Sequence, residues 1–410
     1  MAAGRTPTSW PASARANERV IFGQPALATV HYFWRTTMTP NGIRDIYEKV
    51  IEGERVTYEE GIRLYESNDL IALGEMASTV RQRKHGDYVY FNKNRHINPT
   101  NVCAFHCNFC SFARTSDNMP GAYTFMPDEV VAKIKPTVDE GITEFHIVGG
   151  LHPQLGFQYY VDLLRALKQA YPWVHLKAFT AVEIDFFCQL EQKNDHAILS
   201  ELVAAGLDSM PGGGAEIFHW DVRRKICPEK ANMERWLEIH SVAHELGLMT
   251  NATMLYGHIE TYEHRVHHLV ALREQQDKDI AAGTPGRFQT FIPLAFHPME
   301  NGLGRRLKRR WTSGIDDMKT LAVSRIMLDN FPHIKAYWVM LTPAMAQIGL
   351  DFGANDIDGT IVEEHIYHDA GAQTEEHMGR GELMRLIRAA GRIPVERDTV
   401  YNVVKVHEGL

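Results

Sequence analysis

His96-Ile97-Asn98-Pro99-Thr100-Asn101-Val102-Cys103-Ala104-Phe105-His106-Cys107-Asn108-Phe109-Cys110 is the most informative segment of this 410-residue chain. It holds three of the five cysteines of the chain, at the spacing C-x3-C-x2-C, within one short loop. Three thiolates serve only three of the four irons of a cubane cluster, whereas ferredoxin loops supply a fourth cysteine. The spacing therefore indicates a cluster on Cys103, Cys107 and Cys110 whose fourth iron binds a further ligand.

Two other uses of these cysteines have to be weighed against a cluster. A zinc ion could take His106 or His96 as its fourth ligand, although structural zinc sites are usually built from two separate cysteine pairs. A disulfide framework is disfavoured, because five cysteines in 410 residues is a low density and three of them crowd one loop. Cys188 and Cys227 stand alone in the sequence and are expected to be packing residues.

Composition and charge exclude several classes of protein. Hydrophobic residues make up 44% of the chain and charged residues 23%, which is ordinary for a globular protein. The net charge of −8 argues against a nucleic-acid partner, and the basic run Arg305–Arg310 is expected to be a solvated loop. No apolar run approaches the roughly 20 residues that span a bilayer, so no membrane segment is expected. The cysteine usage fits a reducing compartment, such as the cytoplasm.

The sequence divides into three parts. Residues 1–37 carry four arginines and a single acid and show no periodic apolar face, so they are expected to be a disordered extension or a misassigned start. Residues 38–85 have apolar positions at helical spacing and a capping box from Thr57 to Glu60, which predicts a helical preface packed on a barrel. Residues 86–410 are expected to form that barrel together with C-terminal elements.

From residue 86 onward, short β-rich runs alternate with helical runs, which is typical of a parallel α/β fold. Eight such units predict a TIM-type (β/α)8 barrel, whose active site lies at the C-terminal ends of its strands. The predicted strands are Val89–Ile97, Glu144–Val148, His175–Ala181, Ser209–Met210, Met249–Leu255, Phe288–Pro293, Ile334–Met340 and Phe352–Ile357.

Glycines and one acid follow these predicted strands at positions that suit ligand binding. Gly149-Gly150 comes after the second strand, where glycine lets a ligand approach the backbone, although paired glycines there often mark only a turn. Glu183 ends the third strand and could accept hydrogen bonds from ribose hydroxyls, or lie in solvent. Gly212 and Gly213 follow the fourth strand in a run without the features of a phosphate-binding loop, so they suit the close approach of a flat ligand.

The cysteine spacing, with Phe109 before the third cysteine, resembles that of the radical S-adenosylmethionine (SAM) superfamily. This resemblance implies a [4Fe-4S] cluster that binds SAM through its amino and carboxylate groups at the fourth iron. One electron then cleaves SAM into methionine and a 5′-deoxyadenosyl radical. The resemblance also implies that Gly149-Gly150 contacts the methionine amino group, although Leu151 replaces the usual acidic residue. Gly257-x-x-Glu260 loosely matches the adenine-contact motif of the superfamily, which makes Glu260 a further candidate.

Longer stretches narrow the resemblance to the menaquinone and deazaflavin group of the superfamily. The features that favour the aminofutalosine synthase family within that group are Leu294–Pro298 and Asp358–Glu364. The other stretches that carry the resemblance to the group are Pro211–Phe218, Asn251–Glu260, Phe288–Pro298, Ile334–Met340 and Phe352–Thr360.

The resemblance implies addition of the 5′-deoxyadenosyl radical to the vinyl ether 3-[(1-carboxyvinyl)oxy]benzoate, with loss of bicarbonate, to give 6-amino-6-deoxyfutalosine in menaquinone biosynthesis. It also implies an electron donor such as flavodoxin or ferredoxin. Because this substrate carries two carboxylates, cationic or amide donors should surround it. The candidates, each of which could instead be structural, are His152, Asn251, His258, His297 and Arg223, with Lys225 beside the last.

Three alternatives to this activity stay open. The cyclase of the same pathway, cyclic dehypoxanthinyl futalosine synthase, would share the cluster and SAM motifs, and so would a deazaflavin-precursor synthase. A zinc-dependent (β/α)8 hydrolase that uses His152, His258 and His297 is the alternative from another class.

Overall fold

The computed structural model describes residues 42–139, 141–308 and 311–409. The expectation for residues 1–37 lies outside this range. None of the helices within the described residues is long and apolar enough to cross a membrane.

A parallel seven-stranded sheet forms the centre of the fold, in the order β2-β3-β4-β5-β6-β7-β8. Neighbours in this order are also consecutive along the chain, and helices connect most of them, so the sheet curls as in a TIM-type barrel. This confirms the predicted α/β class. The strands are β2 (Asn94–Ile97), β3 (Glu144–Ile147), β4 (His175–Ala178), β5 (Ser209–Met210), β6 (Met249–Tyr256), β7 (Phe288–Ala295) and β8 (His333–Ile334).

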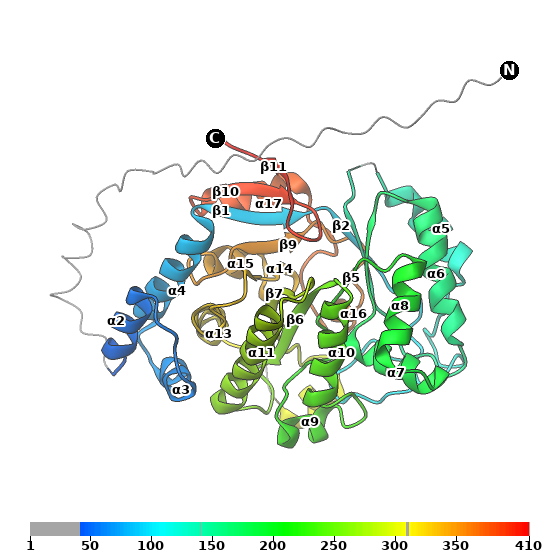
Figure 1. Ribbon diagram of the computed structural model, residues 1–410, viewed down its shortest axis with the longest axis horizontal. Helices are drawn as coiled ribbons and strands as arrows, with labels where there is room; N and C mark the ends of the chain where they lie inside the picture. The colour runs from blue at the N-terminus through cyan, green and yellow to red at the C-terminus, as the bar shows by residue number, and fades with distance from the viewer. Residues whose placement is uncertain (1–41, 140, 309–310, 410) are drawn as a thin grey trace. The chain divides into compact units, whose positions relative to one another are not determined.

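The eighth predicted strand belongs to a second sheet, so the prediction of eight equivalent strands was wrong. This sheet has the order β11-β10-β1-β9 and is built from β1 (Tyr88–Asn92), β9 (Asp356–Gly359), β10 (Ile393–Arg397) and β11 (Val403–Val406). A single bridge between Lys335 and Asp356 connects β9 to the end of β8. On its other side, the Thr360 amide donates to the Asn92 carbonyl at 3.1 Å. The segment after β8 thus meets the start of the barrel through β9, and Figure 1 shows β1, β10 and β11 together at the top.

Three predicted strands were too long, and one of them, His175–Ala181, ends as β4 at Ala178 before α7 (Ala181–Glu191) begins. The run Val89–Ile97 contains two strands, because β1 pairs with β10 and β9 whereas β2 pairs with β3. The run Ile334–Met340 is strand only at its start, and Trp338–Leu341 forms the short helix α14. Its residues are apolar and fully buried, a pattern that a buried strand and a buried helix share.

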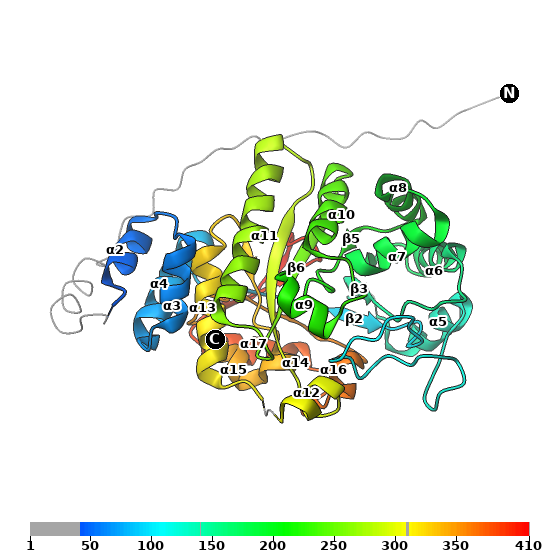
Figure 2. The same ribbon diagram turned by 90° about the horizontal axis from the view of Figure 1, so that it is seen from below.

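Helices surround the curled sheet, and α10 and α11 lie beside β6 (Figure 2). The N-terminal helices α2, α3 and α4 pack mainly on each other, on α11 and on α13. The α-helices are α2 (Arg44–Glu52), α3 (Tyr58–Glu66), α4 (Leu70–His85), α5 (Pro127–Ile134), α6 (Phe157–Ala170), α7 (Ala181–Glu191), α8 (Asp195–Ala205), α9 (Trp220–Ile226), α10 (Met233–Glu245), α11 (Tyr262–Ala282), α12 (Gly302–Leu307), α13 (Gly314–Met327), α14 (Trp338–Leu341), α15 (Pro343–Gly349), α16 (Ile366–Asp369) and α17 (Arg380–Ala389).

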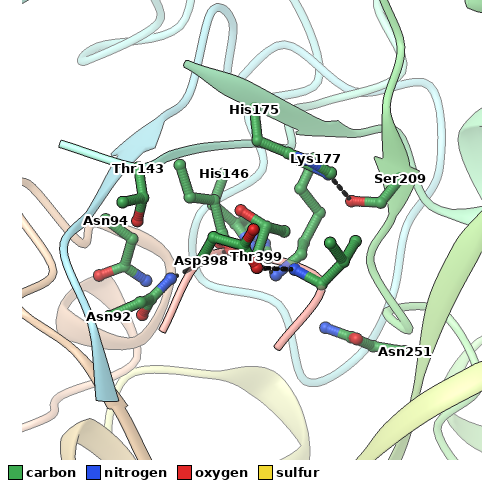
Figure 3. A network of polar contacts seen from close by, with 12 residues as sticks. Asn92, Asn94, Thr143, His146, His175, Lys177, Ser209, Asn251, Asp398 and Thr399 are labelled. Atoms are coloured by element: carbon green, nitrogen blue, oxygen red, sulfur yellow. Dashed lines mark hydrogen bonds and ion pairs between the residues drawn. The ribbon is translucent and has the colours of Figure 1, made fainter. Parts of the chain in front are cut away.

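The C-terminal segment reaches the interior of the sheet. Figure 3 shows side chains from β1, β3, β4 and β6 gathered around Asp398 and Thr399. The Gln289 side-chain amide donates to the Thr399 carbonyl at 3.1 Å, and Thr399 is fully buried. Just before it, Arg397 forms a buried ion pair with Asp356 at 2.7 Å. Residues at and directly after the end of β10 therefore contact β7 and β9 from the interior of the fold.

Candidate active site

A cavity of 280 Å³ lies inside the curled sheet, where the cysteine loop meets the residues that follow the strands. All three cysteines of the loop line it, as do Gly149-Gly150 and Gly212–Gly214. β6, β7 and α16 add an apolar part to the lining, and other strands add charged and polar side chains. The cavity therefore combines thiols, open backbone and an apolar wall, at the end of the barrel where active sites are expected.

Backbone hydrogen bonds fix the cysteine loop at both ends. The Cys103 amide donates to the Arg114 carbonyl at 2.8 Å, and the Ala104 amide donates to the Leu151 carbonyl at 2.8 Å. The Arg114 guanidinium donates in turn to the carbonyls of Ser111, Phe112 and Ala113. A single arginine thus folds the chain after Cys110 back toward the loop.

The three thiols suit a cluster better than a single ion. All three cysteines are free and line the same cavity. Within the described residues, no group of three His, Cys, Asp or Glu side chains is placed to hold one metal ion. In a cubane cluster each thiolate binds a different iron, so the sulfurs need not converge on one point. Burial raises the pKa of the Cys107 and Cys110 thiols, so cluster binding would have to displace their protons.

The two candidate fourth ligands for zinc lie apart from one another. His106 is exposed, and its imidazole lies 3.6 Å from Glu229. His96 belongs to the interior of the barrel, where its ring stacks on His146 with 4.7 Å between the ring centres. Although His96 lines the same cavity as the cysteines, no three metal-binding side chains among the described residues are placed around one ion, as a structural zinc site needs.

Gly149-Gly150 and Glu183 lie together on one wall of the cavity. The Gly150 amide donates to the Thr100 carbonyl at 2.8 Å, and a Cβ on Gly150 would collide with the Val102 carbonyl. Glu183 accepts from the amides of Thr180 at 2.6 Å and Gly149 at 3.3 Å. Its carboxyl thus closes the capping box of α7 and ties it to the glycine pair. Burial raises the pKa of Glu183 to about 7 despite these hydrogen bonds.

Gly212 and Gly213 also line the cavity, in a loop whose carbonyls accept hydrogen bonds from Arg223. A Cβ on Gly212 would lie only 2.6 Å from the backbone carbonyl oxygen of Asn251, so the loop packs directly on β6. Arg223 is fully buried and donates to the carbonyls of Gly214 and Ala215, at 2.9 and 2.6 Å. Its hydrogen bonds all go to backbone carbonyls and it does not line the cavity. Arg223 therefore stabilises the glycine loop and does not face a ligand.

Three other candidates lie outside the cavity lining. His152 accepts from the Gln154 amide through Nδ1 and donates through Nε2 to Asp117 at 3.0 Å. His258 is fully buried and contacts the Leu255 carbonyl at 3.0 Å. Glu260 accepts from the amides of Gly257 and His258 and from Arg265. Each of these three side chains thus already has a hydrogen-bond partner.

Asn251 and His297 do line the cavity. The Asn251 oxygen accepts from Gln289 at 3.1 Å, which leaves its amide nitrogen to face a ligand. His297 Nε2 lies 3.2 Å from the Met340 carbonyl, which can only accept, so Nε2 carries the proton and Nδ1 is a bare acceptor. Nδ1 has no partner although it is buried, and the same is true of the hydroxyl of Tyr337, which also lines the cavity. Because only His297 of the three proposed zinc-ligating histidines reaches the cavity, the hydrolase alternative loses its metal site.

Two buried lysines in the cavity lining were missed by the sequence reasoning. Lys177 on β4 donates to Glu144 at 2.8 Å, and Lys335 after β8 donates to Asp358 at 2.9 Å. All four side chains line the cavity, and the residues are at most 7% exposed. A lysine has three N–H donors, so each retains donors that its acid partner does not use. Each lysine stands within a predicted strand, and a charged residue at such a position was the one sign in the sequence of a side chain that faces the interior of the barrel.

A third lysine lies beside the thiols. Lys230 donates to Glu216 at 2.6 Å, and both line the cavity. The Lys230 nitrogen also lies 5.1 Å from the centre of the Phe109 ring, next to Cys110 in the sequence. The cavity lining therefore contains Lys230 beside the cysteine loop, in addition to Lys177 and Lys335.

Two sequence families match this chain. The radical SAM superfamily matches residues 97–272, and the CofH/MqnC C-terminal region matches residues 285–410. The aminodeoxyfutalosine synthase of Thermus thermophilus is 50% identical over 371 residues, which cover 89% of this chain and 98% of that protein. The aminodeoxyfutalosine synthase of Streptomyces coelicolor is 48% identical over 374 residues, which cover 89% of this chain and 95% of that protein.

The solved structure of a methylornithine synthase shares the fold. It matches with a TM-score of 0.66 at 18% identity and covers 85% of this chain and 96% of that chain. Similarity at this level of identity concerns the fold alone. The relative with 50% identity over nearly its whole length carries the assignment to a family. The chain therefore belongs to the radical SAM superfamily, within the group that contains the aminodeoxyfutalosine synthases.

Proposed function

We propose that the protein joins the 5′-deoxyadenosyl group of SAM to 3-[(1-carboxyvinyl)oxy]benzoate, and so acts as an aminodeoxyfutalosine synthase in menaquinone biosynthesis. The products are 6-amino-6-deoxyfutalosine, methionine and bicarbonate. The observation that carries the proposal is one cavity that joins three free cysteines to an apolar wall and to two buried lysines, each paired with an acid. The relatives with 48–50% identity bear the same activity in their names.

The cofactors follow from the superfamily. A [4Fe-4S] cluster on Cys103, Cys107 and Cys110, with SAM on its fourth iron, supplies the 5′-deoxyadenosyl radical. Gly149-Gly150 offers backbone groups to the methionine part of SAM. Glu183, which already accepts from two amides, would also accept from the ribose hydroxyls, and Gly212-Gly213 in the cavity lining would contact adenine.

The rest of the cavity suits an aromatic dicarboxylate. Leu255, Ile292 and Leu294 form an apolar wall that would contact the benzoate ring and exclude water from a reactive radical. Lys177, Lys335 and the Asn251 amide offer donors to the two carboxylates, in a buried place where charge-assisted hydrogen bonds are strong. Holding the alkene at a fixed place beside the adenosyl group is the main contribution that these residues make to rate.

The surroundings of the enzyme form part of the proposal. We infer a flavodoxin or ferredoxin as electron donor, no nucleic-acid partner and a cytoplasmic location. The net charge of −8 supports the second point, and five cysteines that the structure leaves unpaired support a reducing compartment.

Product analysis tests the function. The protein, reconstituted with iron and sulfide without oxygen, is given a chemical reductant, the vinyl ether and SAM labelled in its adenosine part. We expect the label in a product that contains adenine, ribose and benzoate, because radical addition retains the whole adenosyl group. Free 5′-deoxyadenosine should be only a minor product.

Stoichiometric 5′-deoxyadenosine with no label in a benzoate product would contradict the proposal. It would favour a reaction that abstracts hydrogen, such as the cyclase of the same pathway. The deazaflavin-precursor synthase is tested in the same assay with tyrosine and 5-amino-6-(D-ribitylamino)uracil in place of the vinyl ether.

A further inference from the structure

The basic run Arg305–Arg310 is a pronounced charge feature that the proposed function leaves unused. Its described cations are Arg305 and Arg306 on α12 and Lys308 directly after it, and all three are exposed. None of the three forms an ion pair with another described residue, although most arginines of the fold have a carboxylate or carbonyl partner. Three unpaired cations in a chain of net charge −8 therefore need an explanation.

Hydrogen bonds attach this segment directly to the cysteine loop. The Leu303 amide donates to the Asn108 carbonyl at 2.8 Å, and the Ser111 hydroxyl donates to the Glu300 carbonyl at 2.8 Å. Asn108 lies between Cys107 and Cys110 in the sequence. Arg305 and Arg306 thus lie only a few residues along the chain from Leu303, which hydrogen-bonds to the cysteine loop.

A second basic segment contacts the same asparagine. The Asn108 amide donates to the Ile226 carbonyl at 2.9 Å, and its side-chain nitrogen donates to the Lys225 carbonyl at 2.7 Å. Lys225 and Arg224 are both exposed at the end of α9. We call the five exposed cations at these two segments the basic rim; they are Arg224, Lys225, Arg305, Arg306 and Lys308.

The acids on the same segments, Asp221, Glu229 and Glu300, offset three of the five rim charges and leave a positive balance of two. Asp221 pairs with Arg224 at 3.1 Å, and Glu229 is engaged by His106. Glu300 is exposed beside α12 but pairs with none of the rim cations. Exposed apolar side chains lie on the same segments, with Trp220 55% exposed and Met299 51% exposed. Exposed apolar groups beside a surplus of charge of one sign are typical of a surface that meets a partner.

We propose that the basic rim is the docking site of a small acidic protein that carries one electron and reduces the cluster, which rests on the proposed function. In this step the carrier loses one electron and the cluster gains one, and no atom is transferred. Electron-transfer encounters bury little area and depend on charge complementarity for their rate. A cationic surface bonded to the cysteine loop would bring an acidic carrier next to its acceptor, against the repulsion of a chain that is acidic overall.

The experiment compares two triple variants of the reconstituted full chain. Arg305→Glu/Arg306→Glu/Lys308→Glu reverses the α12 part of the basic rim. Lys278→Glu/Arg388→Glu/Lys405→Glu changes the net charge equally, with exposed residues on α11, α17 and β11. Iron content and thermal unfolding first establish that both variants fold and load. Flavodoxin is the probe, and its dissociation constant and its rate of cluster reduction are measured, with dithionite as the small reductant.

We expect the rim variant to bind flavodoxin and accept its electron about tenfold more weakly and slowly at low salt, with a much smaller salt dependence. Its reduction by dithionite should match that of the control variant, which should behave as wild type with both reductants. Unchanged flavodoxin binding in the rim variant would overturn the proposal. Equal losses with flavodoxin and dithionite would also overturn it, because the rim would then serve the cluster or the substrate. Product formation with dithionite tests the proposed function separately.

Discussion

At the scale of single residues, the cysteines give the sharpest prediction. Cys103→Ala, Cys107→Ala and Cys110→Ala should each lower iron and sulfide content and abolish SAM cleavage, because each removes one iron ligand. Cys188→Ala should remain loaded and active, since the Cys188 thiol donates to Asp195 instead. Metal and sulfide analysis together with methionine release measures both effects. Equal loss of iron in Cys188→Ala would show that the ligand assignment is wrong.

Glu183 gives a prediction about pH. Burial raises its pKa from 4.5 to about 7, so the folded protein binds a proton that the unfolded chain has released. Its contribution to the free energy of unfolding therefore falls as pH rises from about 4.5 to about 7. Glu183→Gln removes this titration, so wild type should lose on the order of 1–3 kcal/mol more than the variant between about pH 5 and pH 8. Chemical denaturation of the metal-free protein measures this, and parallel pH dependences would contradict it.

Residue types predict a site from sequence only when their spacing along the chain is enough to bring their side chains together. The three cysteines could be identified from sequence because a short loop fixes their relation whatever the surrounding fold. His152 could not be judged because its partner Asp117 is distant in the sequence, and His258 because its burial depends on the packing of the barrel. Lys177 and Lys335 could not be paired with Glu144 and Asp358, since these contacts depend on how distant strands curl together.

At the scale of elements, the turn after β3 gives a prediction. A Cβ on Gly150 would meet the Val102 carbonyl, and this contact is with backbone that cannot rotate away. Gly150→Ala should therefore displace the cysteine loop, lower iron content and cost roughly 1–3 kcal/mol of stability. Gly381→Ala is the matched control, because nothing lies within 4 Å of its Cβ position in α17. Normal iron loading in Gly150→Ala would show that the loop tolerates the displacement.

Helices and central strands could largely be read from the sequence, but the sheet to which a strand belongs could not. The capping box at Thr57 forms as predicted, with the Glu60 carboxylate accepting from the Thr57 amide at 2.7 Å. Local sequence decides such contacts. The division of Val89–Ile97 between two sheets depends instead on β10, about 300 residues away, which no local pattern reports.

At the scale of the whole molecule, the ion pair of Arg397 and Asp356 joins the C-terminal segment to the second sheet. Both side chains are at most 1% exposed, so Arg397→Met would leave a buried carboxylate without its main partner. We expect a loss of about 3–5 kcal/mol in the free energy of unfolding, and partial recovery in Arg397→Met/Asp356→Asn. Arg392→Met, which breaks the more exposed pair with Asp351, should cost about 1 kcal/mol or less. Equal effects of the two single variants in chemical denaturation would contradict this.

The pairing of β1 with β10 has a consequence for synthesis in the cell. Tyr88 lies opposite Ile393 and β1 also pairs with β9, so β1 lacks both neighbours until almost the whole chain has been translated. At about 5–20 residues per second, a ribosome takes roughly 15–55 s to travel from Cys110 to Ile393. During that time the three thiols belong to an unfinished nascent chain, open to oxidation and to stray metals. We therefore expect cluster insertion to follow completion of the chain, and the yield of loaded enzyme to depend on how well the cell protects those thiols until then.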